Sequence, residues 1–463
     1  MSGADLAAAE AMSVHRSGLT EQVAAFVADP DGIIPEETLD TARCSLFDWF
    51  AVLHAGATEP VGDVVRALTV HERSEGKSLA MGLPGAWSAR AAAYVNGAVS
   101  HALDYDDTHF DMLGHPTVAV LPAVIAVAQE RGVSGGDLLR AFAIGAETAC
   151  RLGKQFGRVH YAAGFHVTAT AGIFGATAGV GHLLGLGRER LSHALGFAAT
   201  RSSGLRSQFG TMGKPLHAGM AAAGGIEAAC LAEFGLISRP EGLECVEGFC
   251  ATHGTAAVGS ETGFAPDDAF LFQNVQYKFH ACCHGTHGPL EAVLAVRDQI
   301  EGQPDTIARV AMSVHPQWEN VCCIAEPATA LELKFSLATV IALALKGIDT
   351  SSPATFTAEL CGRRDVRDLA RRVSIRFDSE MSDTVTFATI EMADGRQIQT
   401  SHDLLRPVAQ ALVATKLRRK AAALIGQRQA DDLWAFVSGI HELDGPELAL
   451  RLSDIFSAVE ALQ

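Results

Sequence analysis

Three consecutive segments decide how this chain folds: AAAYVNGAVS (91–100), HALDYDDTHFDMLGHP (101–116) and TVAVLPAVIAVAQE (117–130). The first and third are apolar and rich in small residues, which predicts two buried helices. The middle segment places three histidines and four aspartates between these helices. Because charge is expensive to bury, such residues serve either chemistry or a structural ion pair.

Helical patterns of the same kind continue from about residue 5 to about residue 270. Alanine and glycine are dense in them, which predicts helices that pack closely with little side-chain bulk between them. The patterned segments are 19–29, 35–56, 89–107, 117–132, 134–157, 168–185, 188–204 and 217–235.

The pattern changes after about residue 270. Alternating and β-branched residues predict strands in 307–316, 371–378 and 383–400, the last with a hairpin turn at ADGR. The remaining helical patterns are 329–347, 364–373, 407–425 and 431–443. The sequence therefore predicts a mainly α fold, in which a large all-helical domain formed by both chain ends (1–273 and 409–463) carries a smaller inserted α+β domain (274–408).

Composition excludes several classes of protein. The chain has 463 residues, 48% of them hydrophobic, but no apolar run of 18 residues and no signal-peptide pattern at its start, so we expect neither a membrane span nor secretion. Ten cysteines, some in adjacent pairs, are typical of reduced thiols in a cytoplasmic protein. The net charge of −17 argues against nucleic acids and anionic membranes as partners. A small anionic substrate would need a local cluster of cations.

The charged segment offers the first candidate site. His101, Asp104 and Thr108 are spaced three and four residues apart, so on a helix they share one face. His115 precedes Pro116 and is expected to be extended just before the next helix. A structural aspartate–histidine pair at a helix end explains the same spacing, and both interpretations stay open.

A second candidate lies in RVHYAAGFHVTATAG, where Tyr161 and His166 precede a helix of small residues. His166 stands directly before that helix, near backbone N–H groups that favour anions. The following segment 175–187 is rich in glycine, but it lacks the G-x-G-x-x-G spacing and a preceding strand. It therefore indicates close helix packing rather than a dinucleotide loop.

Two lysines complete the candidates. Lys214 lies between Gly213 and Pro215 before an Ala/Gly helix, where a half-buried ammonium would need an anionic partner. Lys278 begins KFHACCHGTH, in which five His or Cys residues fall within eight positions. This spacing lacks the two separated ligand pairs of a structural zinc site, so we favour a cationic binding loop at the domain junction over a metal site.

Taken together, the chain resembles the MmgE/PrpD family, which includes 2-methylcitrate dehydratase, cis-aconitate decarboxylase and iminodisuccinate epimerase. The resemblance implies a large helical domain with a smaller lid domain, a homodimer, and a reaction without metal or organic cofactor. The matching pieces occur in family order over nearly the whole chain: NGAVSHALDYDDTH, GFHVTATAGIFGA, FGTMGKPLHAGMAAAGGIEAA, YKFHACCHGTH and EPATALELKFSLATVIALAL.

The resemblance also implies where the active site lies. We expect the lysines to bind carboxylates of a small polycarboxylate, a histidine to carry the proton, Asp104 to orient an imidazole and Thr108 to donate a hydrogen bond. Tyr161 is our addition as an acid or base, and the three other aspartates of the segment (106, 107 and 111) are expected to cap or face solvent. The implied site residues are Asp104, Thr108, His115, His166, Lys214, Lys278 and His287.

Differences within the family argue against decarboxylation and leave the exact substrate open. The segment NVCCIAEP (320–327) has no tyrosine, whereas the decarboxylase relatives have one lining the pocket. The loop from Asp104 to His115 is one residue longer than in decarboxylases and similar in length to the epimerase. We predict a hydro-lyase like 2-methylcitrate dehydratase. An epimerase of an iminodisuccinate- or citrate-like diacid is the first alternative, and a decarboxylase or a non-catalytic polycarboxylate-binding protein follows.

Overall fold

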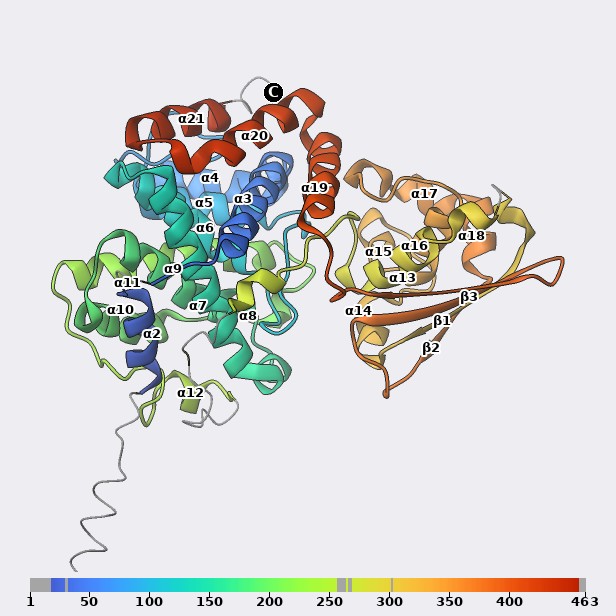
Figure 1. The fold of residues 1–463 in the computed structure, drawn as a ribbon, viewed down its shortest axis with the longest axis horizontal. Helices are drawn as coiled ribbons and strands as arrows, with labels where there is room; N and C mark the ends of the chain where they lie inside the picture. The colour runs from blue at the N-terminus through green and yellow to red at the C-terminus, as the bar shows by residue number, and fades with distance from the viewer. Residues whose placement is uncertain (1–17, 30–31, 256–263, 265–268, 301–302, 458–463) are drawn as a thin grey trace, which may run out of the picture.

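The computed structural model describes residues 18–29, 32–255, 264, 269–300 and 303–457. The chain start, which the sequence predicts to lack a secretory signal, lies outside these residues. Helices gather in one part of the molecule and a small sheet in the other (Figure 1). Within the described residues, no helix is both long and apolar enough to cross a membrane.

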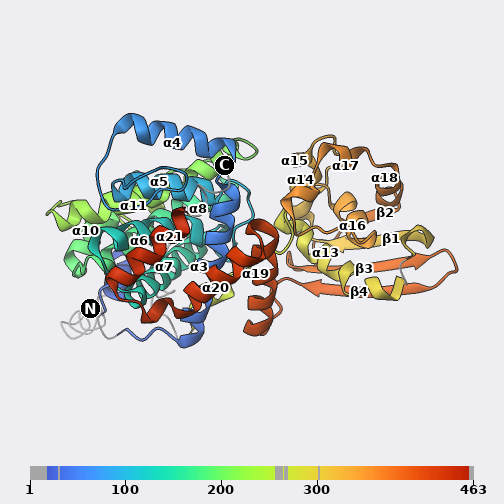
Figure 2. The same ribbon diagram turned by 90° about the horizontal axis from the view of Figure 1, so that it is seen from above.

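Both ends of the described chain contribute to the helical part. Helix α3 packs against α19 and α20, and Figure 2 shows these late helices lying along the early ones. The hydrophobic core of this part runs from Leu19 to Tyr277 and continues from Leu417 to Phe456. Its helices are α2 (Leu19–Val27), α3 (Glu36–Gly56), α4 (Pro60–Glu72), α5 (Ala89–Ser100), α6 (Pro116–Arg131), α7 (Gly135–Ala162), α8 (Val167–Thr170), α9 (Gly172–Leu183), α10 (Arg188–Arg201), α11 (Gly213–Glu233), α12 (Phe249–Thr252), α19 (Gln410–Ile425), α20 (Gln427–Gly439) and α21 (Gly445–Ser457).

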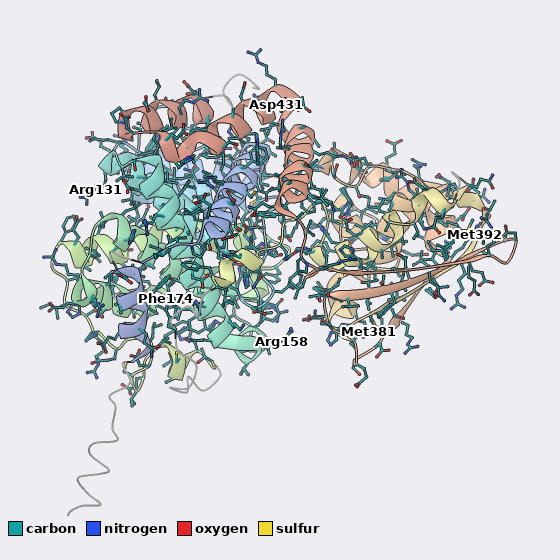
Figure 3. All side chains as sticks on the ribbon, in the orientation of Figure 1. Arg131, Arg158, Phe174, Met381, Met392 and Asp431 are labelled. Carbon is teal, nitrogen blue, oxygen red and sulfur yellow. The ribbon has the colours of Figure 1, made fainter. Side chains whose placement is uncertain are left out.

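Small residues bring these helices close together, as the sequence predicts. A Cβ atom added to Gly145 of α7 would lie 2.6 Å from the carbonyl oxygen of Gly175 in α9, and one added to Gly179 would lie 2.8 Å from a methyl of Val124. The glycine-rich segment 175–187 thus serves helix packing. Figure 3 shows the fully buried Phe174 inside this part of the molecule.

Replacing Gly145 with alanine is expected to destabilise the fold by about 1–3 kcal/mol, because the new methyl overlaps backbone that cannot move aside. The midpoint of urea-induced unfolding measures this loss. Gly439 ends α20 and has no atom within 4 Å of its added Cβ, so Gly439→Ala is the matched control and should change stability little. Equal midpoints for the two variants would show that close packing at Gly145 is not required.

The sheet has the strand order β2-β1-β3-β4. Strand β1 pairs in parallel with β2 and antiparallel with β3, and β3 and β4 form the predicted hairpin. Helices α13 and α16 pack against the sheet, and α18 packs against α16 (Figure 1). The elements are β1 (Ile307–Val314), β2 (Val373–Phe377), β3 (Val385–Met392), β4 (Gln397–Asp403), α13 (His287–Leu294), α14 (Glu319–Cys322), α15 (Ala330–Leu333), α16 (Leu337–Leu345), α17 (Ala358–Gly362) and α18 (Arg364–Ala370).

The predicted mainly α fold with a small sheet is confirmed. A second hydrophobic cluster runs from Ala281 to Met392 and also includes Val52 and Tyr105 from the helical part. The domain boundaries at 273/274 and 408/409, and the role of the inserted part as a lid, stay predictions.

Candidate active site

The charged segment is a loop rather than the end of a helix. The helix predicted over 89–107 stops at Ser100, and His101 follows it as the C-cap. Aspartates are unfavourable at a helix C-terminus because of the helix dipole. Asp104 instead adopts a left-handed backbone with φ of 51°, which aspartate tolerates better than most residues. The prediction that Asp104 and Thr108 share a helical face with His101 is therefore wrong.

The far end of the loop is as predicted. His115 precedes Pro116, is extended (φ −116°, ψ 97°) and forms the N-cap of α6. Between the two ends, Thr108 exchanges backbone hydrogen bonds with Gln276 over 2.8 and 2.7 Å. This bridge joins the loop to the strand-like segment that leads to Lys278.

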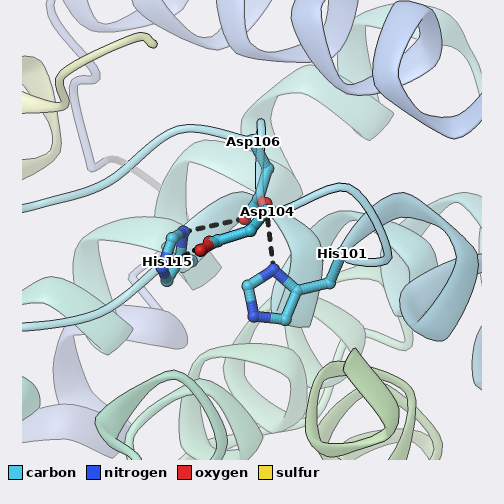
Figure 4. A group of neighbouring side chains, drawn as sticks. All are labelled: His101, Asp104, Asp106 and His115. Carbon is cyan, nitrogen blue, oxygen red and sulfur yellow. Dashed lines mark hydrogen bonds and ion pairs between the residues drawn. The ribbon is translucent and has the colours of Figure 1, made fainter. Parts of the chain in front are cut away.

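Asp106 holds two histidines at once (Figure 4). Its Oδ1 lies 2.9 Å from Nδ1 of His101, and its Oδ2 lies 2.8 Å from Nδ1 of His115. Nδ1 of His115 also lies 2.7 Å from the backbone oxygen of Asp107. The hydrogen bond between Nδ1 and the Asp107 oxygen, with the Asp106 carboxylate charge beside it, favours the tautomer with the proton on Nδ1, which leaves a lone pair on Nε2. The orienting contact that we expected from Asp104 is made by Asp106.

The other aspartates of the loop differ in burial. Asp106 and Asp107 are each 2% exposed, so the prediction that they cap or face solvent is wrong. Asp107 accepts a hydrogen bond from Thr117 over 2.5 Å, and burial raises the pKa of its carboxyl to about 7. Asp111 is exposed, as predicted, and pairs with Lys154.

Asp104 joins the two predicted lysines. Its Oδ1 lies 2.8 Å from Nζ of Lys214 and 3.0 Å from Nζ of Lys278, which also donates to the backbone oxygen of Asp104 over 2.5 Å. Burial alone would raise the pKa of Asp104, but the two ammonium groups hold it well below its usual value. The predicted anionic partner of Lys214 is thus Asp104, whose carboxylate meets two ammonium groups at one oxygen.

The histidine beside this corner is electrically neutral at neutral pH. Burial lowers the pKa of His115 to about 4, even though the charge of Asp106 raises it. Nε2 of His115 lies 3.7 Å from Oδ1 of Asp104, the oxygen that both lysines contact. A proton acceptor therefore stands next to a carboxylate-binding corner.

His166 lies on the other side of His101. It forms the N-cap of α8, as predicted, and its ring stacks on that of His101 with centroids 5.9 Å apart. Its Nδ1 lies 3.0 Å from Nδ1 of His217, so one of these nitrogens donates to the other. Burial and the nearby charges of His101 and Lys214 hold the pKa of His166 well below its usual value.

Thr108 and His287 occupy a neighbouring region. The hydroxyl of Thr108 lies 2.5 Å from Nδ1 of His284, a residue that the sequence did not single out as a site residue. The ring of His287 lies behind that of His284, with centroids 4.7 Å apart, and its Nε2 lies 3.3 Å from the backbone oxygen of Cys282. His284 therefore contacts both Thr108 and His287.

Tyr161 lies at the end of α7, where the guanidinium of Arg206 stacks on its ring at 3.8 Å from the centroid. Burial raises the pKa of its hydroxyl. Among the described residues, no hydrogen bond joins this hydroxyl to Asp104, His115 or His166. Its predicted role as an acid or base stays a prediction.

The charge balance at the loop suits an anion better than a metal ion. His101, Asp104, Asp106 and His115 each offer one ligand atom, and these atoms lie within 4.8 Å of one another. However, the Asp104 oxygen is already contacted by two ammonium groups, and Asp106 is engaged by two imidazole Nδ1 atoms. A divalent cation would meet both lysines at close range, which Coulomb repulsion opposes.

Comparison with known proteins identifies the family of this chain. Sequence models of the MmgE/PrpD N-terminal and C-terminal domains match residues 21–258 and 280–441. The chain is 28% identical to a cis-aconitate decarboxylase of Aspergillus terreus, with 96% of each chain covered. It is 27% identical to the cis-aconitate decarboxylase of Homo sapiens, covering 76% of this chain and 77% of the relative. The chain therefore belongs to the MmgE/PrpD family.

Proposed function

We propose that the protein is a lyase that removes a proton from the carbon next to a carboxylate of a small polycarboxylate. The observation that carries the proposal is the position of His115, whose Nε2 lies 3.7 Å from the carboxylate oxygen that two lysines contact. A substrate carboxylate that binds Lys214 and Lys278 would bring its neighbouring carbon beside this nitrogen. The lysines would then stabilise the negative charge that develops as the proton leaves.

Our specific proposal is a hydro-lyase of the 2-methylcitrate dehydratase kind. His115 takes the proton from carbon, the C–O bond to the neighbouring hydroxyl breaks, and an alkene and water form. Tyr161 is the group that we assign to protonating the leaving hydroxyl, because its hydroxyl carries a proton at neutral pH, and His166 with its partner His217 is the alternative. From the family resemblance we further expect a homodimer and a reaction that needs no cofactor. From the cysteine content we expect a cytoplasmic location.

Decarboxylation of cis-aconitate is the second candidate, because the relatives described above carry that name. It breaks a C–C bond and needs a proton delivered to carbon. The low pKa values of His115 and His166 make both imidazoles acceptors rather than donors at neutral pH, which favours proton removal as the first step. An epimerase needs two proton-carrying groups on opposite faces of the carbon. The neutral imidazoles of His115 and His166 therefore keep the epimerase alternative open.

Proton NMR in D2O tests these reactions together. The protein is incubated in turn with 2-methylcitrate, citrate, cis-aconitate, malate and iminodisuccinate. New vinyl signals from a hydroxy acid support the hydro-lyase, and loss of a carboxylate from cis-aconitate supports the decarboxylase. Deuterium entering a C–H position without a new alkene supports the epimerase. No change with any compound would contradict the proposed substrate class.

The pH dependence follows from the pKa of His115. The base is active when deprotonated, so kcat/KM is expected to be level from about pH 8 down to about pH 5 and to fall through a midpoint near pH 4. Initial rates over this range measure it, with circular dichroism at each pH as the control for unfolding. A midpoint near the ordinary histidine pKa of about 6.5 would contradict a buried, neutral His115.

A further inference from the structure

A buried ion pair lies directly behind the charged loop. Lys420 of α19 and Asp48 of α3 are 1% and 3% exposed, and Nζ of Lys420 lies 2.7 Å from Oδ1 of Asp48. The two helices come from near opposite ends of the described chain, and α19 lies beside the sheet-bearing part in both Figure 1 and Figure 2. None of the proposed catalytic steps uses either residue.

The ammonium of Lys420 has a second partner in the loop itself. It donates to the backbone oxygen of Tyr105 over 2.7 Å and lies 4.1 Å from the centroid of the Tyr105 ring. The hydroxyl of Tyr105 donates in turn to the backbone oxygen of Ser351 over 2.8 Å. Tyr105 is thus fixed at its carbonyl, its ring face and its hydroxyl, and it is 1% exposed.

Tyr105 stands between the two aspartates that organise the site. Asp104 meets the lysines and Asp106 holds the histidines. The carbonyl of Tyr105 belongs to the peptide unit that it shares with Asp106, and a peptide unit is planar. Holding that oxygen therefore fixes the plane from which Asp106 starts and narrows the positions that its carboxylate can reach.

We infer that Lys420 and Asp48 are positioning residues for the reaction. Lys420 sets the orientation of the Tyr105–Asp106 peptide, and through Asp106 it sets the place of His115, while Asp48 keeps the ammonium at that oxygen. The inference rests on the proposed function, because orientation of this loop matters to turnover only if His115 is the base.

The alternative is that the Lys420–Asp48 pair serves stability alone. Replacing both residues at once distinguishes this alternative from a positioning role. Removing one partner of a buried pair leaves an uncompensated charge and destabilises the fold, whereas replacing both with apolar residues of similar shape is often neutral. The variant Asp48→Leu/Lys420→Met has no charge at either position and no donor to the Tyr105 oxygen. A purely structural pair predicts that this variant is both stable and active.

We expect Asp48→Leu/Lys420→Met to have a urea midpoint close to that of the wild type. Its kcat should fall about 10- to 100-fold, because small misplacement of a catalytic group is costly, while KM changes less than about threefold. Lys416→Met is the matched control. Lys416 lies one turn earlier on the same helix, is half-exposed and pairs with Glu291, so its loss should leave kcat unchanged. Wild-type kcat in the double variant would overturn the inference.

A second double variant and a pair of crystal structures complete the test of the positioning role. Asp48→Asn/Lys420→Met leaves an amide at position 48 and takes the place of the first double variant if that one does not fold. Crystal structures of the wild type and the folded double variant test the inference without any substrate: Asp106 should move away from His115. If the wild type acts on none of the compounds tested by NMR, the proposed function fails. In that case, a Tyr105–Asp106 segment with the same position in the wild type and the double variant would overturn the positioning role on its own.

Discussion

Replacing His115 with glutamine is expected to lower kcat/KM by about 10²- to 10⁴-fold, the usual contribution of a positioned acid or base. Glutamine retains polar atoms of similar reach but cannot accept a proton from carbon at neutral pH. The imidazole is the acceptor because Nε2 faces the lysine-bound oxygen and burial keeps the ring neutral. Initial rates with the substrate identified by NMR measure the loss, and citrate binding should persist since Lys214 and Lys278 remain.

The control for this variant is a partly buried histidine that, like His115, contacts a backbone oxygen. Nδ1 of His182 lies 2.9 Å from the backbone oxygen of Val27, in a different region of the helical part. His182→Gln should leave kcat/KM unchanged. If His115→Gln retained more than about a third of the wild-type rate, His115 would not be the base.

Replacing Asp106 with asparagine is expected to lower kcat by about 10²- to 10⁴-fold, the size of effect found where an aspartate fixes the tautomer of a catalytic histidine. Asparagine has the same shape, but its neutral amide lacks the charge that draws the Nδ1 proton of His115, and its NH2 group can compete with the Asp107 oxygen for Nδ1. Raising the pH should not restore activity, because His115 is already neutral. The initial rate from pH 5 to pH 8 is the measurement.

Asp111→Asn is the matched control for Asp106→Asn, since Asp111 lies in the same loop but is exposed and pairs with the exposed Lys154. Its activity should equal that of the wild type. Full activity of Asp106→Asn would mean that Asp106 stabilises the loop without orienting the base.

Local patterns were sufficient to predict most of the fold. The strand predicted at 307–316 is β1, Ile307–Val314, and the ADGR turn joins β3 to β4, because alternation and turn residues act over a few neighbours. The helix end at Ser100 was missed. A run of helix-compatible residues continues beyond it, and the positive φ at Asp104 depends on contacts with distant lysines.

Only part of the site could be predicted, because local patterns do not show which distant residues meet. Spacing and composition singled out the loop and both lysines, but Lys278 contacts Asp104 across 174 positions, which no local pattern reveals. Asp104, Asp106 and Asp107 are identical side chains within four positions, and only the turn decides which one meets the histidines. His284 was passed over because its contact with Thr108 spans 176 positions.

Nitrogen NMR of the histidine ring of His115 tests the central claim most directly, because it needs no substrate. Protein labelled with ¹⁵N-histidine is compared with His115→Gln to assign the signal, and the pH is varied. We predict a neutral ring at pH 7 with the proton on Nδ1 and a lone pair on Nε2, protonating only near pH 4. A ring protonated on both nitrogens at pH 7, or carrying its proton on Nε2, would contradict His115 as the base.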